Sequence, residues 1–80
     1  MDDDQIVQRI GKLAAEEHEL EKSHVGKALA EEDLARLRSI EVALDQCWDL
    51  LRQRRARRAS GQDPEEAAVR PERVVEGYQQ

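Results

Sequence analysis

Residues 31–59, which read EEDLARLRSIEVALDQCWDLLRQRRARRA, decide the fold of this chain. The stretch contains neither Gly nor Pro, and its apolar residues mostly recur three or four positions apart, the spacing of one face of an α-helix. These residues are Leu34, Leu37, Ile40, Leu44, Cys47, Trp48 and Leu51. Acidic residues open the stretch and arginines close it, an order that complements the helix dipole. The stretch therefore predicts a single long helix.

The preceding residues, from about 3 to 24, carry a second helical pattern. Apolar residues follow the same spacing, with Glu17 at the one missing step. They are Ile6, Ile10, Leu13 and Leu20. Between residues 25 and 30 the pattern fails, and Gly26 supplies the backbone freedom of a turn. We therefore expect a first helix that opens on the aspartates after Met1 and ends in a tight turn.

The last part of the chain, residues 60–80, differs from both helical stretches. Ser60-Gly61 ends the second helix, and Asp63-Pro64 favours a short helical turn. Val74, Val75 and Tyr78 offer enough apolar surface to dock onto another element but too little to form a core. We expect this tail to fold back over the helices.

These patterns predict an all-α protein in which residues 1–80 form a single domain. Its architecture is an antiparallel helical hairpin with a short C-terminal tail packing back, and two such hairpins can dimerise into a four-helix bundle. Because the second helix is the longer one, its arginine-rich end should lie beside the aspartates that open the first helix. Attraction between these opposite charges favours this pairing over a shifted register.

The composition suits long helices that bury one stripe. Apolar residues make up 39% of the 80 residues and charged residues another 39%, while Phe is absent and Trp48 and Tyr78 are the only aromatic residues. The net charge of −5 is unevenly placed along the chain. Residues 34–60 hold three acids and seven bases, whereas acids outnumber bases on both sides of them.

Cysteine usage and the N-terminus bear on the location of the protein. Cys47 is the one cysteine, so no intramolecular disulfide can form and nothing points to an oxidising compartment. The acidic start differs from the basic start of a signal peptide, and no apolar run approaches the roughly 20 residues of a membrane span. We expect a cytoplasmic protein that binds no membrane.

Residues 45–56, which read DQCWDLLRQRRA, resemble a family of short actinobacterial proteins known as domain of unknown function 2630. Further resemblance lies in Met1-Asp2-Asp3, in Glu16-Glu17-His18, in residues 37–58 and in the tail from Val69 to Tyr78, so that nearly the whole chain is covered. The family has no assigned activity, cofactor or catalytic residue. The resemblance therefore implies a complete, free-standing protein and no particular site.

Trp48 is the strongest candidate for binding a partner, because a large amphipathic ring on a Leu/Ile stripe is the kind of side chain that anchors interfaces. We favour its being covered by the tail or by a twin subunit, and a foreign partner is the alternative. The predicted partner-binding residues are Trp48, Leu44, Leu51, Arg54, Arg55, Arg58 and Tyr78. The expected function is a protein–protein interaction or scaffold module, whose partner is a second copy or another helical protein.

The arginines between Arg52 and Arg58 support an alternative function, a small regulator that binds nucleic acid, because clustered guanidiniums neutralise phosphates. Three features weigh against it. The chain is acidic overall, no aromatic residue is interleaved with the arginines, and the acids of both ends of the chain can reach them. We favour a solvated helix end, which makes nucleic acid the less favoured partner.

Metal binding and catalysis find little support in the sequence. Glu21 and His24 have the spacing of two metal ligands on one helical face, and Glu17 lies one turn earlier, but the second helix offers no histidine. A surface cluster is therefore the better interpretation. Cys47 is better read as a small core residue than as a nucleophile. We predict no metal site, no cofactor, no catalytic residue and no enzymatic activity.

Overall fold

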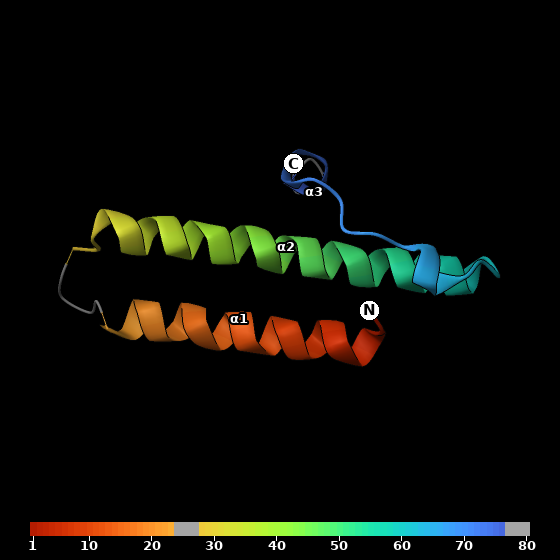
Figure 1. Ribbon diagram of the computed structural model, residues 1–80, viewed down its shortest axis with the longest axis horizontal. Helices are drawn as coiled ribbons and strands as arrows, with labels where there is room; N and C mark the ends of the chain where they lie inside the picture. The colour runs from red at the N-terminus through yellow and green to blue at the C-terminus, as the bar shows by residue number, and fades with distance from the viewer. Residues whose placement is uncertain (24–27, 77–80) are drawn as a thin grey trace.

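The computed structural model describes residues 1–23 and 28–76, which contain helical elements and no strand. These elements are α1 (Asp3–Ser23), α2 (Glu31–Ala59), the 3-10 helix η1 (Pro64–Glu66) and α3 (Glu72–Glu76). α1 and α2 lie side by side and antiparallel, and the chain after α2 runs back along the opposite side of α2 (Figure 1). The predicted all-α hairpin with a tail packed back on it is confirmed, while the predicted turn residue Gly26 lies outside the described residues.

The start of α1 is held by a reciprocal pair of hydrogen bonds. The Asp2 carboxylate accepts from the backbone N–H of Gln5 at 2.8 Å, and the Gln5 side-chain oxygen accepts from the backbone N–H of Asp2 at 2.9 Å. This is the capping-box arrangement, which satisfies backbone donors that have no partner within the first turn. It explains why the helix begins at the third residue of the chain.

The core of the hairpin is small and aliphatic. Ile6 of α1 packs with Leu50 and Leu51 of α2, and these three buried residues are joined by the half-buried Ile10, Cys47 and Ala67. Farther toward the turn, Leu13 and Ile40 are buried as well. The core therefore draws on both long helices and, through Ala67, on the tail.

The end of α2 is set by Gly61. Its φ of +74° lies in the left-handed region, the N–H of Gly61 donates to the carbonyl of Arg58 at 3.2 Å, and the N–H of Gln62 donates to that of Arg57 at 2.7 Å. These are the two bonds of a Schellman motif, which reverses the chain after a helix. Asp63 then accepts from the N–H of Glu65 at 2.9 Å and caps η1.

Candidate interaction surface and arginine cluster

Trp48 lies in the middle of α2 and keeps 46% of its surface exposed, although the next three residues along the helix are buried. Successive residues of a helix are about 100° apart, so Trp48 and Leu50 stand on opposite edges of the stripe that faces α1. The α1 helix covers the centre of that stripe and the Leu50 edge is buried, whereas the Trp48 edge remains open to solvent. The residue that we predicted to bind a partner is therefore accessible.

Contacts between the two long helices show which of their edges meet. Arg36 of α2 binds Glu16 of α1, with both guanidinium–carboxylate distances at 2.6 Å, and Arg9 of α1 lines the same small hollow as Ala43 and Leu50 of α2. These residues mark one flank of the hairpin. The remaining edge of α1 and the Trp48 edge of α2 consequently share the opposite flank.

This opposite flank, which we call the Trp48 flank, carries exposed apolar side chains from both helices. Val7 of α1 is 54% exposed and Leu34 of α2 is 44% exposed, and the helical spacing places both on the same side as Trp48. The residues of the Trp48 flank are Val7, Ala14, Leu34, Glu41, Leu44, Trp48 and Arg55. Large apolar side chains gathered on one face are a feature of interaction sites rather than of an ordinary surface.

The tail occupies a third face of α2, which points away from α1. The fully buried carboxylate of Asp49 accepts from Nε of Arg70 at 2.9 Å and from the Gln53 amide at 2.9 Å, and a second guanidinium N–H of Arg70 donates to its other oxygen. The Arg70 guanidinium holds the pKa of the Asp49 carboxyl below its usual range, against the opposing effect of burial. The Gln53 amide also donates to the carbonyl of Ala68 at 2.8 Å. Side chains of α2 therefore bind both the backbone of the tail and the Arg70 side chain.

This attachment of the tail was not predicted from the sequence. A carboxylate next to Trp48 and on the far side of α2 from the apolar stripe looks like an ordinary solvent-exposed charge. One feature of the sequence pointed to an extended segment here, because Arg70 precedes Pro71 and a residue before proline favours an extended backbone. That feature did not identify Asp49 as the partner of Arg70, since the two residues are 21 positions apart.

Beside the described part of the tail, Trp48 stays partly exposed. Val75 is buried, but Val69 is 61% exposed and Val74 is 38% exposed, and Trp48 itself is nearly half exposed. Among the described residues the tail leaves 46% of Trp48 exposed, because the Asp49 attachment directs it to another face of α2, and the prediction that the tail or a twin subunit covers Trp48 stays a prediction. Tyr78, the last predicted partner-binding residue, lies outside the described residues.

The other apolar residues predicted to bind a partner divide between core and surface. Leu51 is 2% exposed and belongs to the core with Ile6 and Leu50. Leu44 is half-buried, one turn before Trp48 on α2. Leu44 can therefore support a contact made by Trp48, whereas Leu51 holds the hairpin together.

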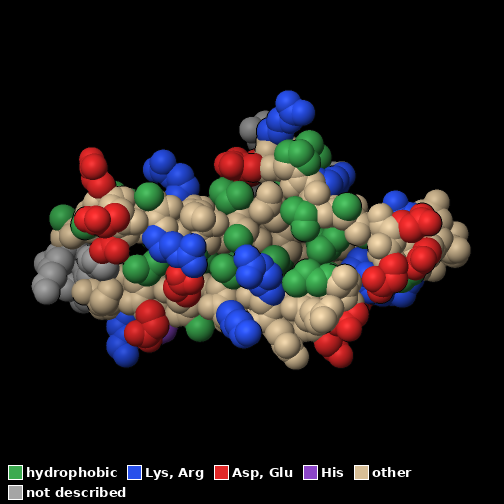
Figure 2. Space-filling view, viewed as in Figure 1, with side chains coloured by type: hydrophobic (Ala, Val, Ile, Leu, Met, Phe, Trp, Pro, Cys, Tyr) green, Lys and Arg blue, Asp and Glu red, His purple; other side chains and the backbone are tan. Residues whose placement is uncertain are grey.

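The arginines near the end of α2 are largely bound by acids of the same chain. Asp3 accepts from Nε of Arg54 at 2.5 Å and from a terminal N–H of Arg58 at 2.6 Å, which lowers the pKa of its carboxyl from 3.8 to about 2. The predicted proximity of the arginine-rich end to the first aspartates is confirmed. Arg57 lies 3.4 Å from Glu66, and Figure 2 shows acidic side chains gathered at this end of the molecule.

Arg54 is the most constrained member of this arginine cluster. Its side chain is only 6% exposed, and it also donates to the Pro64 carbonyl and to the Glu65 carboxylate, each at 3.2 Å. One guanidinium thus joins the start of α1, the end of α2 and η1. Arg55 is exposed and makes no hydrogen bond or ion pair with any residue in the described ranges.

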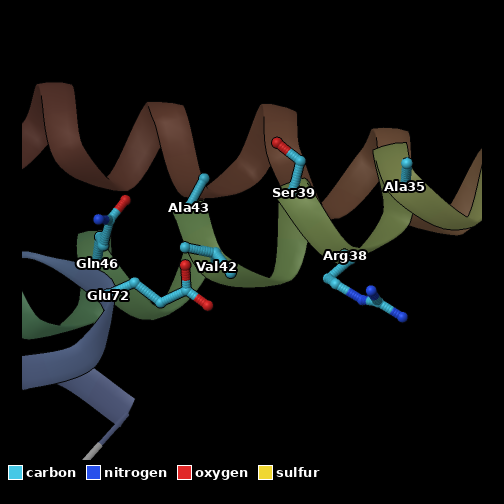
Figure 3. A pocket seen from close by; sticks show the side chains of 7 residues that line it. All are labelled: Ala35, Arg38, Ser39, Val42, Ala43, Gln46 and Glu72. Carbon is cyan, nitrogen blue, oxygen red and sulfur yellow. The ribbon is translucent and has the colours of Figure 1, made fainter.

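A hollow of about 430 Å³ runs along α2 beside α3. Its lining residues are Ala35, Arg38, Ser39, Val42, Ala43, Gln46 and Glu72. Figure 3 shows Glu72 reaching from α3 toward Val42, while Arg38 points away from Glu72. Six of the seven residues come from one face of a single helix, so the hollow is an open groove without converging polar groups.

The described residues offer neither a metal site nor an activated thiol. No group of three or more His, Cys, Asp or Glu side chains is close enough there to hold a metal ion, and the candidate ligand His24 lies outside the described ranges. Burial raises the pKa of the Cys47 thiol more than the nearby Arg9 lowers it, so the less reactive protonated form is favoured. Among the helices that the structure describes, none is long and apolar enough to cross a membrane.

Comparison with known proteins supports the family resemblance. A family model described as "Protein of unknown function (DUF2630)" matches residues 2–80. Uncharacterized proteins of Mycobacterium bovis and of two strains of Mycobacterium tuberculosis are each 53% identical to this chain over 78 residues, covering 95% of this chain and 88% of the relative. No solved structure matches.

Proposed function

This chain belongs to the DUF2630 family of proteins of unknown function, and we propose that it is a protein–protein interaction module that binds a helical surface through the Trp48 flank. The observation that carries the proposal is the 46% exposure of Trp48 at the centre of a long helix. Burying such a ring in an interface releases ordered water and supplies much of the binding free energy of a contact. Val7 of α1 and Leu34, two heptads before Trp48 on α2, are further exposed apolar side chains on the same flank.

The attachment of the tail supports this proposal. Because Asp49 and Gln53 hold the tail on the far side of α2, the Trp48 flank is left open without exposing the Asp49 carboxylate. A helical hairpin with a third segment on one side keeps its other flank available for packing against another helix. Such a surface suits the packing of a partner helix between α1 and α2.

Catalysis is not part of the proposal. The Cys47 thiol has a raised pKa, and the buried Asp49 carboxylate is already bound by Arg70 and Gln53, so neither group is prepared to act on a substrate. Nucleic-acid binding has less support than protein binding, because Asp3 occupies Arg54 and Arg58. Residence in the cytoplasm stays a prediction from the sequence.

Site-specific photo-crosslinking in the native cell tests the proposal. Val7 on the Trp48 flank and Lys12 on the outer surface of α1 are both exposed, and each is replaced in turn by p-benzoylphenylalanine. The expected result is a discrete adduct from position 7, identified by mass spectrometry, that is absent from position 12 and lost when Trp48→Ala is added. Equal adducts from both positions, or none from position 7, would overturn the proposal.

A further inference from the structure

The Trp48 flank carries its charges in a distinctive order along α2. Leu34, Glu41, Trp48 and Arg55 are spaced by seven residues, so they lie in one line along the helix. Acidic side chains precede Trp48 in this region and basic side chains follow it. On the Trp48 flank itself these are Glu41 and Arg55, and Asp45 and Arg52 lie beside this line, toward the tail.

Glu41 and Arg55 make no hydrogen bond or ion pair with any residue in the described part of the chain. Arg52, in contrast, lies beside the buried Asp49 and helps to lower the pKa of that carboxyl. Glu41 and Arg55 cannot pair with each other in one molecule, because 14 residues of helix separate them by about 21 Å. Their complementary charges are therefore available only to another molecule.

We infer that the partner of the Trp48 flank is a second copy of this chain, with the two α2 helices antiparallel about a two-fold axis at Trp48. The inference rests on the proposed function and names its partner. In a two-fold contact residue i meets residue j and residue j meets residue i. With Trp48 on the axis, Glu41 stands opposite Arg55 of the second copy, and Asp45 stands within one residue of Arg52 of that copy.

Other arrangements of two copies lose this complementarity. Parallel α2 helices in the same register would place Glu41 against Glu41 and Arg55 against Arg55, and like charges repel. A shift of the antiparallel pair by one turn would move Trp48 away from its twin and separate the acids from the bases. The Trp48-centred arrangement brings the exposed rings together at the middle of the contact and the charges to its rim, as in other protein interfaces.

The available area is sufficient for a modest dimer. Antiparallel overlap about Trp48 includes α2 residues 37–59, about 34 Å of helix, together with the first turns of α1, which the Asp3 contacts hold alongside. With a helix width of about 10 Å, each copy contributes on the order of 500 Å². The total of about 1,000 Å² is at the lower limit for specific interfaces, so we expect a dimer with a micromolar dissociation constant.

Sedimentation equilibrium of the purified chain under reducing conditions tests the inference, with circular dichroism to check that each variant stays helical. The wild type should dimerise, and Trp48→Ala should weaken the dimer at least about thirtyfold, the loss typical of a central interface residue. Val69→Ala is the matched control, because Val69 is exposed but lies in the hollow with Arg9 on the other flank. It should leave the dimer unchanged.

Charge reversal gives the sharper test. Glu41→Arg and Arg55→Glu should each weaken the homodimer about tenfold, because each change turns two attractive pairs into repulsive ones. The double variant should recover wild-type affinity. An equimolar mixture of the two single variants should form heterodimers in preference to either homodimer, since both charge pairs are then attractive.

The outcomes separate the inference from the proposed function. A wild-type chain that stays monomeric to about 100 µM, or a dimer that ignores both Trp48→Ala and the charge reversals, overturns the second-copy inference. If the crosslinking at position 7 then identifies a different protein, the interaction module stands with that protein as partner. If position 7 yields no adduct, both the proposed function and the second-copy inference are wrong.

Discussion

At the scale of single residues, two buried charges hold the chain together. Arg54 joins Asp3 to the tail at Pro64 and Glu65, and Asp49 binds Arg70. Neither is left with an unsatisfied buried polar atom among the described side chains. A buried charge is costly unless it is paired, so each of these contacts also disfavours any arrangement that would separate the partners.

Asp3 should make the stability of the protein depend on acidic pH. Its pKa is about 2 in the folded chain because Arg58 and Arg54 donate hydrogen bonds to it, below the ordinary 3.8. A carboxylate with a lowered folded-state pKa stabilises the fold above its ordinary pKa, and this contribution disappears as the pH falls from about 4 through about 2. Thermal unfolding followed by circular dichroism should show Asp3→Asn less stable at pH 7 and less sensitive to pH across that window.

Asp4→Asn is the control for this experiment, because it removes a charge from the same helical turn without touching either arginine. It should keep the acid sensitivity of the wild type. Parallel stability curves for the wild type and Asp3→Asn would contradict the role assigned to Asp3.

Arg70→Ala should destabilise the protein by about 2 kcal/mol, because it leaves the fully buried Asp49 carboxylate without its guanidinium partner. Arg73→Ala, which removes an exposed arginine three residues later, should change stability by less than about 0.5 kcal/mol. Urea unfolding of both variants measures the difference. Equal stabilities for the two variants would show that the Asp49–Arg70 pair does not hold the tail.

At the scale of elements, α2 is the central helix, with α1 on one side and the tail on the other (Figure 1). Its length lets it extend past the start of α1, so its last turns can contact both Asp3 and η1. The Schellman motif at Gly61 reverses the chain directly after α2, which brings η1 back beside the last turns of α2. The end of α2 is therefore as important to the fold as its apolar stripe.

The two described glycines should respond to alanine in opposite directions. Gly61→Ala places a Cβ at a φ of +74° and should cost about 1 kcal/mol of stability. Gly11→Ala adds a Cβ in the middle of α1 that meets no side chain or other segment within 4 Å, and should add about 0.5–1 kcal/mol of stability. Urea unfolding is the measurement for both, and a stabilising Gly61→Ala would show that the turn can form without a left-handed residue.

At the scale of the whole molecule, the unequal distribution of charge along the sequence is largely neutralised by folding. The basic segment of α2 meets acids from the start of the chain at Asp3 and from the tail at Glu65 and Glu66. What remains on the Trp48 flank is an acidic half and a basic half on either side of an exposed ring. This surface favours a protein partner of matching charge order over a uniformly anionic one.

Nucleic-acid binding should accordingly be weak. Fluorescence titration against duplex DNA at low salt should give no binding in the micromolar range, since phosphates would have to displace Asp3 from Arg54 and Arg58. Asp3→Asn removes that competitor and should bind more than the wild type does. Tight, steeply salt-dependent binding by the wild type would contradict the assignment of these arginines to the fold.

Much of the architecture could be predicted from the sequence because helix formation depends on local properties. The apolar spacing of residues 31–59 and the aspartates before Ile6 predict two long helices, and the loop between them is too short for anything but an antiparallel pair. The charge order also predicted that the arginine-rich end of the second helix would lie near the first aspartates, and the contacts of Asp3 with Arg54 and Arg58 confirm it. Trp48 was predicted to bind a partner because the type of side chain is itself informative, and that role stays a prediction.

The sequence by itself thus determined the helices, their ends and their pairing, since each depends on spacing and charge within or at the ends of one segment. Only the tertiary structure decided that Asp49 binds Arg70, that the tail packs on the far face of α2, and that Trp48 remains partly exposed. These outcomes depend on contacts between residues 15 and 21 positions apart in the sequence. Several faces of α2 could have accepted the tail, and the choice follows from which one satisfies a buried carboxylate and the tail carbonyl groups together.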